Sequence, residues 1–275
     1  MIRSSSAEHR RAVAAALTVS SFFHVAIPAR HGSTRLPGKV LAPIRGKPML
    51  QWVYERACAS GARDVLIATD SDAIAAAASA FGATARMTSA AHASGTDRLA
   101  ELAAIERWPE ADIVVNVQGD EPLMPPALIR QVAALLESDP QAAIATLAAP
   151  IESLPEFLDP NAVKVVVDAK GRALYFSRAP IPWSRDGAPA GLPSQRIFAG
   201  ARRHIGIYAY RVGALRRLAS VAPAALERIE KLEQLRALAN GLVITVADAV
   251  EKPGPDVNTA EDLERVSELF RRQQV

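Results

Sequence analysis

Short apolar runs alternate with longer amphipathic stretches through the first half of the chain. The apolar runs have the length and the flanking turn residues of buried strands, and the stretches between them repeat with a helical period. This alternation predicts an α/β fold with a doubly wound, mostly parallel sheet. The expected strands are residues 22–27, 64–68, 112–117 and 143–148, and the expected helices are residues 48–60, 72–81, 96–107 and 126–137.

The pattern becomes β-rich after Pro150, where the turn Asp168-Ala169-Lys170-Gly171 predicts a hairpin. We expect a first lobe over residues 22–150 and a smaller β-rich lobe over residues 151–275 that completes a single domain. Residues 184–194 lack periodicity and predict a mobile surface loop near a site. The expected elements are strands at 162–167, 173–176, 203–210 and 242–246, a helix at 226–240 stopped by Gly241, and a last helix opened by a capping box at Thr259.

The N-terminal residues 1–21 begin with basic side chains and continue into an Ala/Val/Leu stretch, a faint likeness to a signal peptide. This stretch runs directly into the first expected strand, so its removal would damage the fold. We therefore expect a mobile extension or a misplaced start. Because no apolar run approaches the ~20 residues needed to cross a bilayer, we expect no membrane insertion and a cytoplasmic protein.

Charge and cysteine content exclude several classes of protein. The chain has 32 Lys+Arg against 29 Asp+Glu, which argues weakly for an anionic ligand. Only 5% of residues are aromatic and the positive charge is scattered, so no nucleic-acid partner is expected. The one cysteine, Cys58, excludes an internal disulfide and a set of Cys ligands for zinc, and we expect it to be a buried apolar residue.

The loop after the first strand, PARHGSTRLPGK at residues 28–39, combines two glycines with Arg30, Arg35 and Lys39. Glycine allows backbone N–H groups to approach phosphate oxygens, and the three cations can neutralise a polyphosphate. The loop is not a Walker A sequence, because five residues separate Gly32 from Gly38 and Val40 follows Lys39 in place of Ser or Thr. It is not a dinucleotide fingerprint, because the G-x-G-x-x-G spacing is missing. A solvated basic turn is the alternative interpretation.

A second polar segment, NVQGDEP at residues 116–122, follows an apolar strand at the edge where α/β sheets present ligands. Asp120 is the leading candidate ligand for Mg²⁺, which prefers hard oxygen donors and often needs only one or two carboxylates beside substrate phosphates. Glu121 could instead be a helix-capping residue.

With these segments, five others complete a resemblance to the 3-deoxy-manno-octulosonate cytidylyltransferases, a family of nucleotide-diphospho-sugar transferase type. The resemblance runs from about Phe23 to the C-terminus. The further segments are HASGTDR at 92–98, residues 161–167, YFSR at 175–178, residues 204–210 and LEQLR at 232–236.

The resemblance implies that the chain transfers CMP from CTP to 3-deoxy-D-manno-octulosonate, releases pyrophosphate with the help of Mg²⁺, and thereby activates the sugar for lipopolysaccharide core synthesis. It also implies a homodimer. The first lobe would bind the nucleotide, and the second would bind the sugar and dimerise. The implied catalytic residues are Arg30, Arg35, Lys39 and Asp120, and the implied nucleotide-binding residues are Ser33, Ser94, Gly95, Arg98 and Gln118.

The resemblance further implies a sugar pocket with a cation for the carboxylate and hydrogen-bonding groups for the hydroxyls. Each residue also has a structural interpretation: Tyr208 could be core, His204 a satisfied interior histidine, and Glu233 a solvated helix residue. The implied pocket residues are Arg178, His204, Tyr208, Glu233 and Gln234.

One departure from the family concerns the second metal ligand. The late Val-Asp-Thr motif of the family stands here as Val257-Asn258-Thr259, so Asn258 offers an oxygen without a charge. We expect Asp120 and Asn258 to hold Mg²⁺ more weakly than two carboxylates would, unless Asp256 compensates. Glu261 and Asp262 are assigned to the start of the last helix.

The implied reaction is an in-line attack by the anomeric hydroxyl of the sugar on the α-phosphate of CTP. The sequence identifies no general base and no covalent nucleophile. Two alternatives stay open: a related sugar nucleotidyltransferase, such as one acting on a sialic acid, and a non-catalytic nucleotide- or sugar-binding regulator in which Asn258 marks the loss of metal catalysis.

Overall fold

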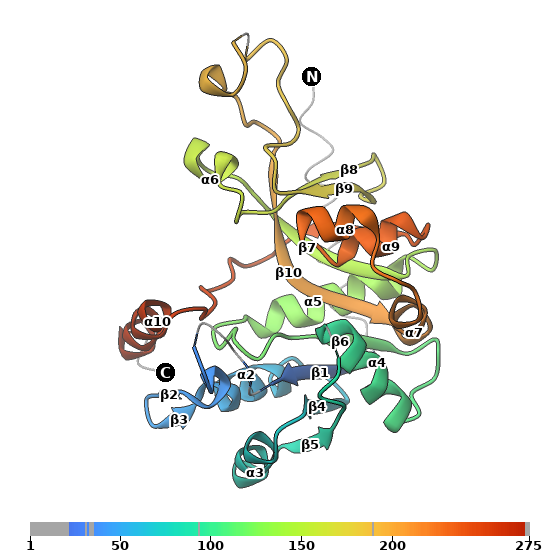
Figure 1. Ribbon diagram of the computed structural model, residues 1–275, viewed down its shortest axis with the longest axis vertical. Helices are drawn as coiled ribbons and strands as arrows, with labels where there is room; N and C mark the ends of the chain where they lie inside the picture. The colour runs from blue at the N-terminus through green and yellow to red at the C-terminus, as the bar shows by residue number, and fades with distance from the viewer. Residues whose placement is uncertain (1–21, 31, 33–35, 93, 189, 273–275) are drawn as a thin grey trace.

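The computed structural model describes residues 22–30, 32, 36–92, 94–188 and 190–272, so the predicted extension at residues 1–21 lies outside the described residues. Within this part of the chain, nine strands form one sheet of order β11-β7-β10-β6-β1-β4-β5, with β8 paired to β10 and β9 paired to β8 (Figure 1). The strands are β1 (Phe23–Ala29), β4 (Asp64–Thr69), β5 (Thr84–Met87), β6 (Ile113–Asn116), β7 (Ile144–Pro150), β8 (Lys164–Val167), β9 (Ala173–Ser177), β10 (Arg202–Arg211) and β11 (Ile244–Asp248).

Most strands of the described sheet run in the same direction, and β9 and β10 run against the others, which confirms the predicted fold class. Strand β1 lies between β4 and β6, and both pairs are parallel. Strand β10 is antiparallel to β6 and to β7, between which it lies. Strands from both sides of residue 150 therefore hydrogen-bond into one sheet, and the proposed division into two lobes stays a prediction.

Helices cover both faces of the sheet. Alternate side chains of a strand point to opposite faces, and accordingly Val25 and Ile27 pack with one group of helices whereas Ala26 packs with the other. Helices α2, α3 and α5 cover the first face, and α4, α7 and α9 the second. The helices are α2 (Met49–Cys58), α3 (Asp72–Ala80), α4 (Gly95–Ile105), α5 (Pro126–Ser138), α6 (Leu154–Leu158), α7 (Val212–Ser220), α8 (Ala225–Glu230), α9 (Gln234–Ala239) and α10 (Ala260–Arg272).

Two local predictions are wrong. The single helix expected over residues 226–240 is two helices, because Lys231 adopts a left-handed conformation with φ of 55° that ends α8. Cys58 is exposed at the end of α2 rather than buried. The sequence analysis also missed α7, whose Val212, Leu215 and Leu218 recur at helical spacing and whose helix packs against α4.

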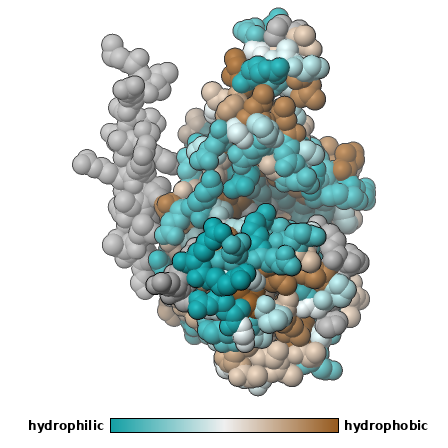
Figure 2. Space-filling model, turned by 90° about the vertical axis from the view of Figure 1, so that its left-hand side faces the viewer, coloured by the Kyte–Doolittle hydropathy of each residue, from teal (hydrophilic) through white to brown (hydrophobic). Residues whose placement is uncertain are grey.

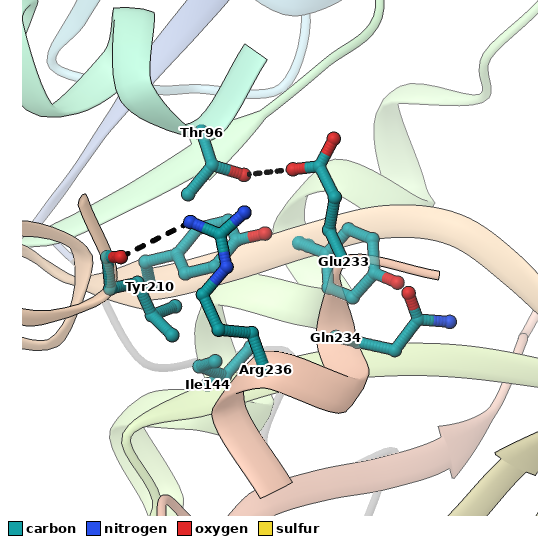
Figure 3. Close-up of a pocket in the computed structure, with 8 residues that line it drawn as sticks. Thr96, Ile144, Tyr210, Glu233, Gln234 and Arg236 are labelled. Atoms are coloured by element: carbon teal, nitrogen blue, oxygen red, sulfur yellow. Dashed lines mark hydrogen bonds between the residues drawn. The ribbon is translucent and has the colours of Figure 1, made fainter. Parts of the chain in front are cut away.

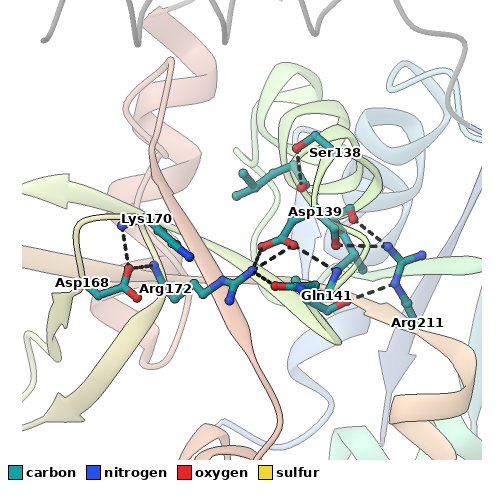
Figure 4. Close-up of polar contacts among 10 residues, drawn as sticks. Ser138, Asp139, Gln141, Asp168, Lys170, Arg172 and Arg211 are labelled. Atoms are coloured by element: carbon teal, nitrogen blue, oxygen red, sulfur yellow. Dashed lines mark hydrogen bonds and ion pairs between the residues drawn. The ribbon is translucent and has the colours of Figure 1, made fainter.

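The predicted hairpin joins β8 to β9, and its turn is closed by the Asp168 carboxylate, which accepts from the backbone N–H groups of Lys170 and Arg172 at 2.8 and 2.9 Å (Figure 4). The guanidinium of Arg172 then reaches Asp139 at the end of α5. Arg211, at the end of β10, donates to the Leu136 and Ala142 carbonyls in the same region. Segments from both parts of the chain are thus tied together at the end of α5.

The C-terminal helix α10 docks on α2 through an apolar cluster of its own. The rings of Trp52 and Phe270 lie 4.6 Å apart, and Val257 and Val266 are fully buried beside them. The predicted capping box is confirmed: the Asp262 N–H donates to Thr259 Oγ1, and Asp262 Oδ2 accepts from the Thr259 N–H.

The segment between β9 and β10 forms an arm that projects beyond the body of the molecule (Figure 1). It carries the described part of the loop predicted at residues 184–194, including a short 3-10 helix at Leu192–Ser194. None of the helices in the described residues is long and apolar enough to cross a membrane.

Candidate active site

Three segments that the sequence analysis singled out meet at the carboxyl ends of β1 and β6. A side chain at Gly119 would place its Cβ 3.1 Å from the Pro28 carbonyl oxygen and 3.4 Å from Val40. Gly95 similarly lies against the Pro28 ring, at 3.7 Å. Glycine at 119 therefore allows the loop after β6 to approach the basic loop after β1.

Lys39 and Asp120 are joined directly at this meeting point. The Lys39 ammonium donates to Asp120 Oδ2 at 2.5 Å, and both side chains are largely buried. Lys39 begins the short helix Lys39–Leu41, and Gly38 before it has a φ of 68°, a conformation that favours glycine. The predicted phosphate cation and the predicted metal ligand thus occupy one site.

Of the other predicted residues on this side of the site, Arg30 and Gln118 belong to the described part of the chain. Arg30 is exposed at the end of β1, and Gln118 is half-buried beside Gly119. Ser33 and Arg35 lie outside the described residues.

The residues predicted near the base or ribose form the first turn of α4. Ser94 Oγ caps the helix by accepting from the Asp97 N–H at 3.2 Å. Arg98 is almost fully buried and donates to Asp70 at 2.7 Å and to Thr88 at 2.5 Å. The Arg98 guanidinium thus joins α4 to the residues that follow β4 and β5. The prediction of a nucleotide-binding role did not include this structural contact.

The segment before α10 passes beside Asp120. The Val257 N–H donates to the Asp120 backbone carbonyl at 3.0 Å, so the backbone just before Asn258 lies against that of Asp120, the residue that the resemblance paired with Asn258. Asn258 Nδ2 donates to Asp256 Oδ2 at 2.5 Å, and the Asn258 N–H donates to the capping carboxylate of Asp262. Asp262 is thus a helix cap, as expected.

Glu121 is not the helix cap that the alternative interpretation proposed, since α5 begins only at Pro126. Its Oε2 atom is buried without a hydrogen-bond partner in the described residues. Burial, and then the charges of Asp120 and Asp256, raise the pKa of the Glu121 carboxyl to about 8. A protonated carboxyl at this place limits the repulsion among three neighbouring acids.

The donor set at this place suits magnesium better than zinc. Within the described residues, no group of three or more His, Cys, Asp or Glu side chains is arranged to hold a metal ion. Asp120, Asp256 and the Asn258 amide supply hard oxygen atoms from two adjacent segments. Such a set fits Mg²⁺ that takes its remaining ligands from phosphates and water, and it does not fit a structural zinc.

A hollow of about 800 Å³ lies beside these acids. His204 lines it together with Glu121, Asn161, Arg203 and Asp256. It faces α6 and the segment before α10. Hydrophilic residues cover most of the middle of the molecular surface that bears these elements (Figure 2). A hollow lined by several polar side chains suits a polyhydroxylated ligand.

Three of the predicted sugar-binding residues surround a second, water-sized cavity of about 10 Å³ (Figure 3). Tyr208, Glu233 and Gln234 line it, and the His204 ring lies 5.2 Å from that of Tyr208. Glu233 Oε2 accepts from Thr96 Oγ1 at 2.8 Å. The side chains at 204, 208, 233 and 234 are therefore contiguous, and Glu233 is anchored rather than merely solvated.

Arg178 is held at the edge of this group by Glu230. The Arg178 N–H donates to Glu230 Oε2 at 2.9 Å, and its guanidinium donates to the Glu230 and Pro160 carbonyls. The fully buried Lys164 donates to the Arg178 carbonyl at 2.8 Å. The loop that carries Arg178 is thus fixed from three sides.

The sequence analysis missed Thr96, Glu230 and Thr146, which contact predicted site residues. Thr96 and Glu233 are separated by 137 positions, and Thr146 and His204 by 58. Such pairs leave no local pattern. Thr96 is the exception, because it lies inside the segment HASGTDR at residues 92–98, which the resemblance had already singled out.

The chain is similar to known cytidylyltransferases over most of its length. The profile of a family described as "Cytidylyltransferase" matches residues 24–248. Two proteins called 3-deoxy-manno-octulosonate cytidylyltransferase, from Thioalkalivibrio sulfidiphilus and Cellvibrio japonicus, are 54% and 55% identical to it; each alignment covers 90% of this chain, with 99% and 98% of the relatives. A solved structure of CMP:2-keto-3-deoxy-manno-octonic acid synthetase complexed with CTP superposes with a TM-score of 0.82 at 41% identity, covering 92% of this chain and all of that one.

Proposed function

Because the chain belongs to the family of 3-deoxy-manno-octulosonate cytidylyltransferases, we propose that it transfers CMP from CTP to 3-deoxy-D-manno-octulosonate and releases pyrophosphate. The product is an activated sugar for lipopolysaccharide core synthesis. The observation that carries the proposal is the contact between Lys39 and Asp120 at the carboxyl ends of β1 and β6, next to a polar hollow.

The reaction is a single displacement at phosphorus. The anomeric hydroxyl oxygen of the sugar forms a bond to the α-phosphorus of CTP and loses its proton to solvent, and the bond from that phosphorus to the bridging oxygen of pyrophosphate breaks. Lys39, with Arg30 and Arg35 from the same loop, would stabilise the charge on the reacting and departing phosphates. No covalent intermediate with the protein is needed.

We propose that Asp120 and Asn258 hold Mg²⁺, with Asp256 contributing the charge that Asn258 lacks. The hydrogen bond from Asn258 to Asp256 and the contact of Val257 with Asp120 support this assignment. When bound, Mg²⁺ would neutralise phosphate oxygens during the displacement.

The sugar would occupy the hollow that His204 lines, and Tyr208, whose ring lies 5.2 Å from that of His204, would contact it together with Glu233, Gln234 and Arg178. The neutral donors and acceptors suit hydroxyl groups, and the guanidinium suits a carboxylate. Ser33, Ser94, Gly95, Arg98 and Gln118 are proposed on the nucleotide side.

We also propose that the enzyme is cytoplasmic and acts as a homodimer. The projecting arm exposes the apolar side chains of Trp183, Leu192 and Ile197, which a second copy would cover. Light scattering at several protein concentrations measures the mass in solution and tests the dimer.

The direct test is pyrophosphate release from CTP and 3-deoxy-manno-octulosonate across a magnesium titration, with ATP, GTP, UTP and a sialic acid in parallel. We expect release that requires both CTP and the octulosonate. Pyrophosphate release with the sialic acid but not with the octulosonate would show that the chain is a related sugar nucleotidyltransferase. A folded protein that is silent with all substrates would be a binding protein without catalysis.

A further inference from the structure

Strand β10 is irregular where it carries the sugar-pocket residues. Its register with β7 shifts between Ile205 and Tyr208, so that two extra residues, Gly206 and Ile207, bulge opposite β7. Thr146 of β7 is fully buried at this bulge. Its Oγ1 atom lies 2.7 Å from the Ile207 carbonyl oxygen and 3.2 Å from that of Ile205.

The same hydroxyl also contacts the His204 ring, with 2.9 Å between Oγ1 and Nε2. A threonine hydroxyl has one proton to donate, and backbone carbonyls can only accept. At 2.7 Å, the Ile207 carbonyl requires that proton, since two oxygen lone pairs would otherwise repel each other. The hydrogen bond to His204 must therefore be donated by the ring, from Nε2–H to Thr146 Oγ1.

A neutral imidazole carries only one N–H, so a proton on Nε2 leaves Nδ1 as an acceptor. Burial lowers the pKa of His204 to about 3, which keeps the ring neutral at physiological pH. The ring is also oriented by its neighbours: Phe176 meets it edge-on at 5.1 Å, and Tyr208 packs at 5.2 Å. Within the described part of the chain, Nδ1 makes no hydrogen bond, and His204 lines the 800 Å³ hollow.

We propose that Thr146 is a positioning residue that holds His204 as the Nε2–H tautomer, so that Nδ1 accepts a hydrogen bond from a hydroxyl of the sugar. The inference rests on the proposed function, because it takes the hollow as the sugar site. A lone pair on Nδ1 attracts a hydroxyl donor and repels a carboxylate, so the acid group of the sugar lies away from His204.

The first test reads the tautomer directly. In protein labelled with ¹⁵N-histidine, long-range ¹H–¹⁵N correlation distinguishes a protonated ring nitrogen from an unprotonated one, and a His204→Asn variant identifies the signal. We expect wild-type His204 to carry its proton on Nε2 alone between pH 6 and 8. A proton on Nδ1, or a mixture of the two tautomers, would overturn the proposal.

The second test separates positioning from stability. Thr146→Val removes the acceptor and leaves a buried N–H unpaired, so we expect the KM for the octulosonate to rise roughly tenfold while the KM for CTP changes less than about twofold. Thr146→Ser keeps the hydroxyl and should recover most of the loss. Thr245→Val, on β11 beyond β7, makes the same chemical change away from β10 and serves as the matched control.

A folded Thr146→Val protein with wild-type KM for the sugar would refute the positioning role. If that variant does not fold, the wild-type tautomer and the Thr146→Ser kinetics decide. A wild-type protein without activity on CTP and the octulosonate refutes the proposed function and the assignment of the hydroxyl to the sugar. The tautomer measurement is independent of activity, so the two failures can be told apart.

Discussion

Lys39 and Asp120 are 81 positions apart in the sequence, yet their Nζ and Oδ2 atoms lie 2.5 Å apart. The pair joins the loop after β1 to the loop after β6, and the close approach at Gly119 makes it sterically feasible. Each partner offsets the other's charge before substrates bind. A phosphate would compete with Asp120 for Lys39, and a cation would compete with Lys39 for Asp120. Binding of the nucleotide and the metal ion would therefore break the ion pair and free both side chains to contact their ligands.

Replacing Lys39 with alanine should lower kcat/KM by roughly 10²- to 10³-fold, the usual cost of removing a group that stabilises charge in the transition state. Initial rates of pyrophosphate release measure the effect. Lys170→Ala, on the exposed turn between β8 and β9, removes the same charge far along the chain and should stay within about twofold of wild type. If both variants lost kcat/KM equally, the effect would come from the net charge of the protein and not from the position of Lys39 in the site.

Replacing Asn258 with aspartate should lower the magnesium concentration for half-maximal rate by roughly three- to tenfold, since a carboxylate binds Mg²⁺ more strongly than an amide. Asp256→Asn should shift the requirement in the opposite direction. Binding of Mn²⁺ followed by electron paramagnetic resonance gives a readout that does not depend on turnover. If neither variant alters metal binding, residues 256–258 are not at the metal.

Replacing Thr96 with valine should raise the KM for the octulosonate about tenfold, because the hydrogen bond to the Glu233 carboxylate is charge-assisted. A double-mutant cycle with Glu233→Gln checks that the two side chains act together: the double variant should be little worse than either single one. Full additivity of the two losses would contradict the coupling.

The stability of the protein should depend on pH through His204. Its pKa is lowered to about 3 in the folded state, whereas an unfolded histidine titrates near 6.5, so the unfolded state binds the extra proton between these values. This contribution is fully present above about pH 6.5 and is lost as the pH falls toward 3, by at most about 5 kcal/mol. Urea unfolding of wild type and His204→Asn from pH 4 to 8 isolates it: the difference between the two should shrink on acidification and stay constant above pH 7.

Replacing Phe270 with alanine should destabilise the protein by about 3–5 kcal/mol, because a fully buried ring that packs on Trp52 leaves a cavity. Undocking of α10 would also loosen residues 256–258 beside Asp120, so we expect a higher magnesium requirement. Urea unfolding and metal titration measure the two effects. Arg272→Ala, which removes an exposed ion pair with Glu268, should cost no more than about 0.5 kcal/mol.

Features that depend on neighbouring residues could be predicted from the sequence alone. The periods of apolar positions identified the strands around Val25 and Val115 and the helices that follow, and the capping box at Thr259 marked the start of α10. The basic loop and the NVQGDEP segment were found because glycines, cations and carboxylates occur there together in a short span. These are local properties of the chain.

Features that depend on contacts between distant segments are visible only in the folded structure. The insertion of β10 between β6 and β7 could not be predicted, because hydrophobic period does not specify which strands pair. Lys231 ends α8 in a conformation that a lysine rarely adopts, so propensity pointed to one continuous helix. The partners that set the chemistry, Thr146 for His204, Thr96 for Glu233 and Glu230 for Arg178, come from separate elements, and only folding brings them within hydrogen-bond distance.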